Sequence, residues 1–584
     1  MSNYLIHFIL SLFFAESLLF LFRHRLSPLY LTLGLLIVPA TSYALFYNFN
    51  LGLIQSNLVY AIGYAGALWA VFSFFLLTSF HRDHIHDNQK FVIIKEIILL
   101  FIQCILIVLF FIVPWAIDTF PLSNPEAVLF TLFSPITGAN NFIVDTFKEK
   151  VITSSLTTFF SLLAIQQIIS QSLFKFKISG SFHKGPLSFH LSSDKNRKMS
   201  FFHVTKLTSF LLFGVVFINL LLLPCIIKNA PFEALFGSKI DSTLYKKHFE
   251  DPKEAISLAQ KNLIVIFLES MTNNFSKYTP ELNSWKEKGI SFNPGGTSVS
   301  GTSWTIAGIT SALCGIPLNM PLTDEEYTGK LPTYLPNAIC IMDLMKNARY
   351  NQLSIQGSSA NFTQIRDFWT AHGNVEIRDN LHYERTKEIP PNYNVFWGME
   401  DKKTLAFAQQ SLDSLAKLSN PFALYISTID THQPDGYLDS SCQHNEENQY
   451  KNVLRCSSSM IGEFLSWIQK QSWFENTVVA VVGDHIIQGL AAKAGLPQNE
   501  ELYTTAFFIN SGFENKNSQR SFSNLDYAPS ILEALGWELP HHGFGLGRSL
   551  FSNEKTMLEI YGLDSLNTLL RQRSIQYDHF LYGN

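Results

Sequence analysis

The first 228 residues of this 584-residue chain contain six runs of about 20 mostly apolar residues, and this feature most restricts the possible folds. A helix needs roughly 20 apolar residues to cross the hydrocarbon core of a bilayer. The pattern therefore predicts an N-terminal polytopic α-helical membrane domain over 1–228. The fifth run is more polar than the others, which makes its span the least certain; the runs cover about 4–22, 28–48, 58–80, 97–117, 151–173 and 207–227.

Charge is scarce in this chain and is concentrated after the apolar runs. Only 15% of the residues are charged and the formal net charge is −4, whereas soluble domains average about 25% charged residues. A polyelectrolyte that binds nucleic acid is excluded by this balance. We therefore expect a lipid bilayer as a partner, and an ordinary aqueous domain joined to the apolar part.

The orientation of the membrane domain follows from the positive charge in its short loops. Lysine and arginine residues occur after the first run, in 81–96 and in 174–206, where Lys175, Lys177 and Arg197 are examples. Positively charged loops stay in the cytoplasm. Six alternating helices then leave everything after Lys228 outside the cytoplasm.

Four of the six cysteines fall in the proposed external part of the chain. Four cysteines allow three connectivities, and we expect the sequential one, Cys314 with Cys340 and Cys442 with Cys456. Disulfides would fit an oxidising compartment. The alternative is four buried free thiols.

The chain after the membrane domain changes pattern. A polar connector with helical character in EDPKEAISLAQ occupies 229–260, and a weakly patterned tail follows 551. Between them, short apolar runs at 262–268, 422–427, 477–482 and 505–509 predict buried strands. Amphipathic stretches such as 401–418 and 457–471 separate these runs. Strands that alternate with helices indicate an α/β domain with a largely parallel sheet over 261–550.

Side chains that bind metals follow two of these strands. Glu269 ends the first, and Asp484 with His485 ends the third. The carboxyl ends of parallel strands are where chemistry collects. Between them, SVSGTSWTIAGITSALCGIP (298–317) predicts a turn running into a helix, with Thr302 near the helix start, where a phosphate is favoured. We expect these four residues to hold one Zn²⁺ or Mn²⁺ ion, with the threonine oxygen as ligand and nucleophile.

Two features of this region leave alternatives open. Thr297 and Ser303 compete with Thr302 as nucleophile, because GTS occurs twice. The glycine-rich GFGLGR (543–548), preceded by His541 and His542, suggests either a phosphate cradle or, more in keeping with its context, a plain tight turn.

Taken in order, these segments resemble the glucan-modifying phosphoglycerol transferases, a branch of the alkaline phosphatase/sulfatase superfamily. Lipoteichoic acid synthases share the framework, but their segments resemble these less closely. The similarity covers about 260–550, and the segments that carry it are IFLES (266–270), GTSWTIAG…CGIPL (301–318), PNAICIMDLMKN (336–347), IQGSSANF (355–362), FWGMED (396–401), PFALYISTIDTHQPDG (421–436), VVGDH (481–485) and GLGRSL (545–550).

The resemblance implies a sulfatase/alkaline-phosphatase-like fold for the external domain. It implies one divalent metal ion, Mn²⁺ or Zn²⁺ with Mg²⁺ possible, as cofactor. Phosphatidylglycerol would be the donor, and a periplasmic glucan or another polyol the acceptor. The protein would lie in the bacterial inner membrane with its catalytic domain in the periplasm.

The resemblance also assigns roles to residues. Thr302 becomes the nucleophile, and His432 the general acid/base or phosphate ligand. Candidates for holding the glycerol phosphate are Trp304, Arg366 and Trp397, and the remaining metal ligands are Glu269, Asp484 and His485.

Two other classes of function compete with this one. The first is another enzyme of the same fold, a phosphoethanolamine transferase, a lipoteichoic acid synthase-like enzyme or a sulfatase-like hydrolase. The second is a catalytically inert membrane protein whose outer domain binds or senses a ligand.

Overall fold

A computed structural model describes 89–119, 145–171, 177–180, 189–192, 205, 208–210, 212–213 and 216, and then 243–582 except 259, 320–333, 434, 489–499, 515–518 and 573. The chain divides into two compact units. One comprises 1–117 with 142–226, and the other 118–141 with 227–584. The two units are described separately.

The first unit contains long helices at two of the apolar runs, where the sequence predicts helices. Helix α4 (Gln89–Thr119) includes the run at 97–117, and η1 (Lys148–Thr153) with α7 (Ser154–Gln171) covers most of 151–173. A short hairpin pairs β1 (Lys177–Gly180) with β2 (Phe189–Ser192). Across the part of the chain that the structure describes, none of the helices combines the length and apolar character needed to span a bilayer. The runs at 4–22, 28–48 and 58–80, and most of 207–227, lie outside the described residues.

A seven-stranded sheet forms the centre of the second unit. Its order is β5-β10-β9-β4-β8-β6-β7. The five strands from β9 to β7 are parallel, and β10 is antiparallel to both β9 and β5. The largely parallel sheet predicted from the sequence is thus confirmed; its strands are β5 (Ile290–Ser291), β10 (Ala506–Ile509), β9 (Thr477–Gly483), β4 (Asn262–Leu268), β8 (Phe422–Ser427), β6 (Asn351–Gln356) and β7 (Glu376–Arg378).

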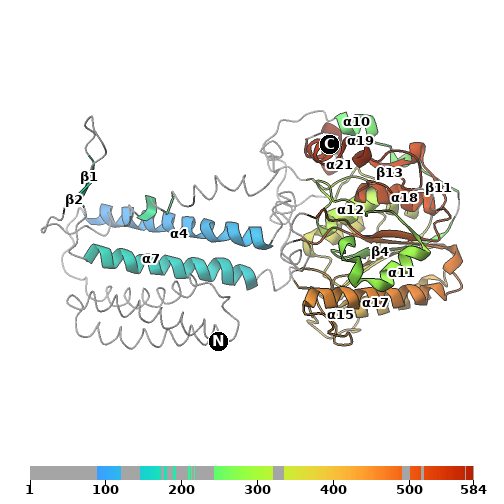
Figure 1. Cartoon of the computed structure of the whole chain (residues 1–584), viewed down its shortest axis with the longest axis horizontal. Coiled ribbons are helices and arrows are strands. Elements are labelled where there is room, and N and C mark those ends of the chain that lie inside the picture. Colours follow the sequence, from blue (N-terminus) through green and yellow to red (C-terminus); the bar gives the residue numbers. More distant parts are fainter. Residues whose placement is uncertain are drawn as a thin grey trace. The chain divides into compact units, whose positions relative to one another are not determined.

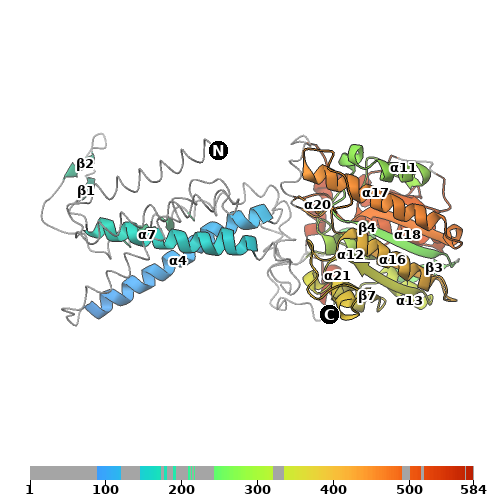
Figure 2. The same cartoon turned by 90° about the horizontal axis from the view of Figure 1, so that it is seen from below.

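Helices cover both faces of this sheet, and β4 shows why. Every residue of β4 is buried, and alternate side chains enter two different hydrophobic cores. On one face, Val265 and its neighbours pack under α12 (Thr305–Cys314), α13 (Ile341–Asn347) and α18 (Tyr527–Ala534). On the other, Ile266 and its neighbours pack against α11 (Pro280–Lys288), α16 (Asp401–Leu415) and α17 (Gln449–Gln469). Figure 1 shows α12 and α18 on one side of β4 and α17 on the other, and Figure 2 shows α16 and α17 crossing the same face.

Smaller elements surround the sheet. The connector was expected to be helical around 250–260, but only a single turn follows Asp251 before β3 pairs with β11. The tail after 551 is helical and packs on the domain, where the Tyr577 hydroxyl donates to the Pro317 carbonyl at 2.7 Å. These elements are α10 (Thr243–His248), β3 (Ile256–Ser257), α14 (Ile365–Ala371), α15 (Asn380–Arg385), β11 (Trp537–Glu538), α19 (Met557–Tyr561), α20 (Leu563–Arg571) and α21 (Ile575–Tyr582).

Two expectations about local links are confirmed. The disulfides join Cys314 to Cys340 and Cys442 to Cys456, the sequential pairing. The glycine-rich run is a tight turn, in which β12 (Gly543–Phe544) pairs with β13 (Gly547–Arg548) around a left-handed glycine. It is therefore a structural hairpin and not a phosphate cradle of the strand-to-helix kind.

Candidate active site

The carboxyl ends of three adjacent parallel strands, β8, β4 and β9, form the floor of the candidate active site. Leu268 and Gly483 are register partners in β4 and β9. The residue that follows each of these two strands is acidic. The side chains of Glu269 and Asp484 therefore lie next to each other at the strand ends. The loop after β8 contributes Thr428, whose hydroxyl accepts the Glu269 amide at 3.0 Å.

His485 completes a cluster of three donor side chains. Its Nε2 lies 3.5 Å from Glu269 Oε1 and 3.6 Å from Asp484 Oδ2, and all three residues are buried. Its Nδ1 lies 2.9 Å from the Ile486 carbonyl, and only a protonated nitrogen can donate to that oxygen. The lone pair is therefore on Nε2, which faces both carboxylates, as a metal-ligating imidazole requires.

Ser270 fixes the two carboxylates in place. Its hydroxyl donates to Glu269 Oε1 at 2.7 Å, and its amide donates to Asp484 Oδ1 at 2.9 Å. The backbone of Ser270 has a left-handed φ of 51°, which a non-glycine residue rarely adopts. Such an unfavourable conformation is maintained where the surrounding contacts determine it.

The two buried carboxyl groups of the cluster favour binding of a cation. Burial, together with the nearby Glu269 carboxylate, raises the pKa of Asp484 to about 8. Burial opposes charge on His485, but Asp484 and Glu269 outweigh it and raise the pKa of the imidazole. Two buried carboxylates side by side are costly unless a positive charge pairs with them. Two carboxylates and an imidazole whose ligand atoms lie within 4.8 Å of one another fit a Zn²⁺ or Mn²⁺ ion.

The first residue of α12 brings a hydroxyl to this cluster. Thr305 Oγ1 lies 3.3 Å from Glu269 Oε2 and 3.4 Å from His485 Nε2. The first turn of a helix leaves backbone N–H groups without intrahelical partners, and its dipole favours an anion. A phosphoryl group could therefore contact the Thr305 hydroxyl and the helix N-terminus at the same time.

The structure places the expected nucleophile, Thr302, in the turn before α12. The Thr302 side chain is fully buried, and its hydroxyl donates to the Val299 carbonyl at 2.9 Å while accepting the Val299 amide at 3.0 Å. Thr302 therefore closes the turn before α12 instead of sharing an ion with the cluster. Of the two alternatives, Thr297 binds the Phe522 carbonyl through its amide, and Ser303 accepts a hydrogen bond from Gln488 through its carbonyl.

His432 reaches the same site from the loop after β8. It is half-buried, and its Nδ1 lies 2.8 Å from the Gln433 carbonyl, which leaves the lone pair on Nε2. Burial lowers the pKa of His432, although Glu269 acts in the opposite direction. The Trp397 ring lies 4.2 Å from the imidazole between centroids, with its indole N–H buried and lacking a hydrogen-bond partner among the described residues. Trp397 and His432 thus form one wall of the site.

The other two predicted substrate residues make structural contacts. Arg366 donates to Asp379 at 2.6 Å and to Asn361 at 2.7 Å, contacts that hold the 358–364 loop in place. Trp304 is buried in the hydrophobic core at the N-cap of α12. Neither residue is brought to the Glu269 cluster by a described contact.

Sequence reasoning missed a pair of buried carboxyl groups behind the His432 loop. The Ile429 amide donates to Asp401 Oδ1 at 2.7 Å, and the Asp401 amide donates to Asp430 Oδ2 at 3.1 Å. The other oxygen of each carboxyl is buried without a hydrogen-bond partner among the described residues. Asp401 was quoted within FWGMED and Asp430 within DTHQPDG, and nothing in either string reveals that they meet.

The fold and the site define the class of this domain. Residues 261–537 match the family model for sulfatases. This match supports the predicted sulfatase/alkaline-phosphatase-like α/β fold for the C-terminal domain. Solved structures that are similar to the chain include an alkaline phosphatase superfamily protein from Vibrio parahaemolyticus, which is 21% identical, has a TM-score of 0.46, and covers 56% of this chain and 82% of that one. A lipoteichoic acid synthase from Listeria monocytogenes is 17% identical with a TM-score of 0.39, covering 56% and 80%.

Curated relatives of the chain carry the name of one particular enzyme, phosphoglycerol transferase I. The chain is similar to phosphoglycerol transferase I of Citrobacter koseri, with 29% identity over 346 residues, covering 56% of this chain and 44% of the relative. Phosphoglycerol transferase I of Escherichia coli is also 29% identical, over 336 residues, covering 54% and 42%. The matched region thus spans less than half the length of these relatives.

Proposed function

We propose that this protein is a membrane-bound, metal-dependent transferase that moves phosphoglycerol from phosphatidylglycerol to a glucan or another polyol. Thr305 would carry the phosphoglycerol group between donor and acceptor. The resemblance to phosphoglycerol transferase I supports the choice of group and donor. The apolar runs of 1–228 would hold the protein in the bacterial inner membrane, and the two disulfides are consistent with a periplasmic catalytic domain.

The contact of Thr305 with Glu269 and His485 carries this proposal. A free hydroxyl is a poor nucleophile at neutral pH and needs activation. Glu269, Asp484 and His485 would hold the divalent ion, with the Thr305 oxygen as a further ligand. Such an ion lowers the pKa of a bound hydroxyl and polarises phosphoryl oxygens.

The first displacement would form a phosphothreonine ester. The N-terminal amides of α12 would hold the phosphoryl oxygens while Thr305 Oγ1 attacks phosphorus. The bond between phosphorus and the diacylglycerol oxygen breaks as the bond to Thr305 forms. The hydroxyl proton passes to neutral His432 and then to the departing diacylglycerol, which matches the lowered pKa of that imidazole.

The second displacement would reverse these roles. A hydroxyl of the acceptor gives its proton to His432 Nε2 and attacks the phosphorus held on Thr305. The Thr305 oxygen leaves and takes a proton, which restores the enzyme. The indole N–H of Trp397 beside His432, which has no hydrogen-bond partner among the described residues, would donate to the glycerol moiety and position it.

The experiment supplies headgroup-labelled phosphatidylglycerol to the purified full-length protein with Mn²⁺ or Zn²⁺. We expect wild type to transfer label to a polyol, and Thr305→Ala to abolish transfer. Without acceptor, the wild-type peptide containing Thr305 should gain the mass of one glycerophosphoryl group.

A matched pair of variants distinguishes the two threonines. Thr302→Ala should lose stability, because the Val299 turn loses its side-chain hydrogen bonds, but should still form the labelled intermediate. Persistent labelling in Thr305→Ala would refute the assigned nucleophile. Release of label from phosphatidylethanolamine alone would favour a phosphoethanolamine transferase.

A further inference from the structure

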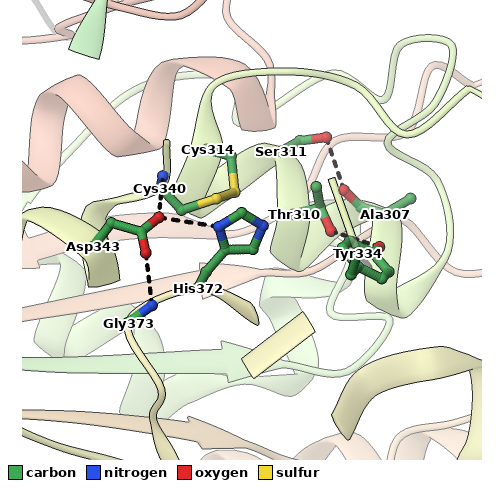
Figure 3. Close-up of a disulfide and its surroundings, with 9 residues drawn as sticks. All are labelled: Ala307, Thr310, Ser311, Cys314, Tyr334, Cys340, Asp343, His372 and Gly373. Atoms are coloured by element: carbon green, nitrogen blue, oxygen red, sulfur yellow. Dashed lines mark hydrogen bonds and ion pairs between the residues drawn. A yellow bond between two sulfur atoms is a disulfide. The ribbon is translucent and has the colours of Figure 1, made fainter. Parts of the chain in front are cut away.

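A second group of metal-binding side chains lies beside the Cys314–Cys340 disulfide (Figure 3). The Cys340 sulfur, one oxygen of Asp343 and one nitrogen of His372 lie within 4.8 Å of one another. Cys314 is the last residue of α12, Cys340 precedes α13, and His372 follows α14. Three helices therefore meet at this cluster.

His372 is held in one orientation with one nitrogen left over. Its ring is buried, with 3% of the residue exposed, and Nδ1 lies 3.0 Å from Asp343 Oδ2. The Asp343 carboxylate also accepts the Cys340 and Gly373 amides at 3.0 and 2.7 Å. Because this carboxylate accepts, the imidazole proton is on Nδ1 and the lone pair on Nε2.

That Nε2 has no hydrogen-bond partner among the described residues. Buried polar atoms are nearly always paired, so an unpaired one needs a reason. Figure 3 shows the imidazole lying directly beside the disulfide sulfurs. A carboxylate that holds one histidine nitrogen while the other is free is the arrangement that orients histidine ligands toward metals.

We propose that reduction of this disulfide opens a site for a thiophilic divalent cation such as Zn²⁺. The ligands are the thiolates of Cys314 and Cys340 and the Nε2 of His372, with Asp343 orienting the ring. Two thiolates and an imidazole are donors that Zn²⁺ prefers, and water or a carboxylate can complete four-coordination.

The chemistry requires an external two-electron reductant such as a dithiol or a phosphine. A dithiol supplies two electrons and two protons, the bond between the cysteine sulfurs breaks, and the dithiol becomes a disulfide. Binding of the cation then releases the two thiol protons to solvent. The cation restores the link between α12 and α13 that the disulfide provided, at the end of α12 opposite Thr305.

Co²⁺ reports thiolate ligands through a sulfur-to-metal charge-transfer absorption, which the Glu269 cluster cannot produce because it has no sulfur. The full-length protein carries Cys442→Ser and Cys456→Ser, so that the other disulfide contributes no thiols. It is reduced to completion with a phosphine, as alkylation of Cys314 and Cys340 verifies. We expect Co²⁺, added beyond what the Glu269 cluster can bind, to produce a band that saturates at one thiolate site per protein. Oxidised protein should show no such band, and Zn²⁺ should displace the Co²⁺.

Two variants test the ligand His372 and the residue that orients it, Asp343. His372→Ala should weaken Co²⁺ binding at least tenfold, and Asp343→Asn by about 10–100-fold. His382→Ala, a histidine in α15 outside the cluster, should bind as the parent does. If His372→Ala fails to fold in its oxidised form, Asp343→Asn carries the test. A missing band in reduced protein, or undiminished binding in Asp343→Asn, would overturn the proposal whether or not Thr305 is the nucleophile.

Discussion

Gly308 lies directly against the backbone carbonyl of Asp484. A β-carbon built on Gly308 would overlap that carbonyl oxygen, which the Asn524 side chain also holds through a hydrogen bond. Only a glycine lets α12 approach the end of β9 so closely. This approach is what places Thr305, one turn earlier in the helix, beside Glu269 and His485.

The first prediction follows from this packing. Gly308→Ala should displace α12 from β9 and lower the rate of transfer at least about a hundredfold, since a shift of about 1 Å at a reacting group has that effect. Steady-state kinetics with labelled phosphatidylglycerol would measure it. Gly462→Ala in α17 is the matched control, because its new methyl group also clashes, but with Glu281 of α11 and not with the strand end that carries Asp484. Equal rates for Gly308→Ala and wild type would contradict this role.

The second prediction concerns the affinity for the metal. Ser270 donates to one carboxylate through its hydroxyl and to the other through its amide. Ser270→Ala removes only the first bond and should raise the metal concentration for half-maximal activity by about 10–100-fold. The maximal rate should recover at saturating metal. Titration of chelator-treated protein with Mn²⁺ or Zn²⁺ tests this, with the exposed Ser414→Ala as control. An unchanged titration would mean that the Ser270 hydroxyl does not orient Glu269.

The buried parts of the fold and the metal cluster could be predicted because their sequence signals are local. Runs of branched apolar residues predicted β4 and β8 to the residue, and polar residues at strand ends identified Glu269, Asp484 and His485. By contrast, β6 was missed because polar residues such as Gln352 and Ser354 interrupt its apolar pattern, and β7 was missed because it has only three residues.

The sequence alone could not decide between Thr302 and Thr305 as the threonine beside the cluster, for a physical reason. Thr302 and Thr305 are three residues apart, and the sequence does not reveal at which residue the turn ends and α12 begins. A turn closed by the Thr302 hydroxyl shifts the start of the helix to Thr305. Likewise, the ion pair between Arg366 and Asp379 depends on loops whose conformation no spacing determines.

The third prediction is a pH dependence that belongs to His432. Burial lowers the pKa of this imidazole, so its neutral form, which accepts a proton, dominates at neutral pH. Transfer at saturating metal should fall only as the pH drops below about 6.5, the unperturbed value for histidine. His432→Gln should lower the rate by about 10²–10⁴-fold and lose this acid limb. An acid limb that persists in His432→Gln would assign it to the metal ligands.

The Asp401–Asp430 pair sets up the last prediction. Burial raises the pKa of Asp401 to about 7, and burial together with Asp401 raises the pKa of Asp430 to about 10. Glu269 and Glu400 act in the same direction on Asp401, and Glu400 and Asp439 on Asp430. At neutral pH at least one proton therefore stays on the pair, which lessens the cost of burying two carboxyl oxygens that have no hydrogen-bond partner among the described residues.

Because the folded protein keeps protons on the Asp401–Asp430 pair that the unfolded chain releases, the free energy of unfolding depends on pH. The unfolded chain releases both protons near pH 4 while the folded protein keeps them, so the free energy of unfolding must fall as pH rises from about 4 toward 10. In Asp430→Asn, the amide oxygen can still accept the Asp401 N–H, and the side chain carries no charge at any pH, so much of this fall should disappear. We expect unfolding midpoints of wild type and variant to be similar at pH 5. At pH 9 the variant should be the more stable by about 1–3 kcal/mol.

Asp439→Asn is the control. Burial raises the pKa of Asp439, but hydrogen bonds from Ser441 outweigh burial and lower it, so removing this carboxylate should not give the same gain in stability. If Asp430→Asn is less stable than wild type at pH 9, the charge on Asp430 is not what lowers stability at high pH.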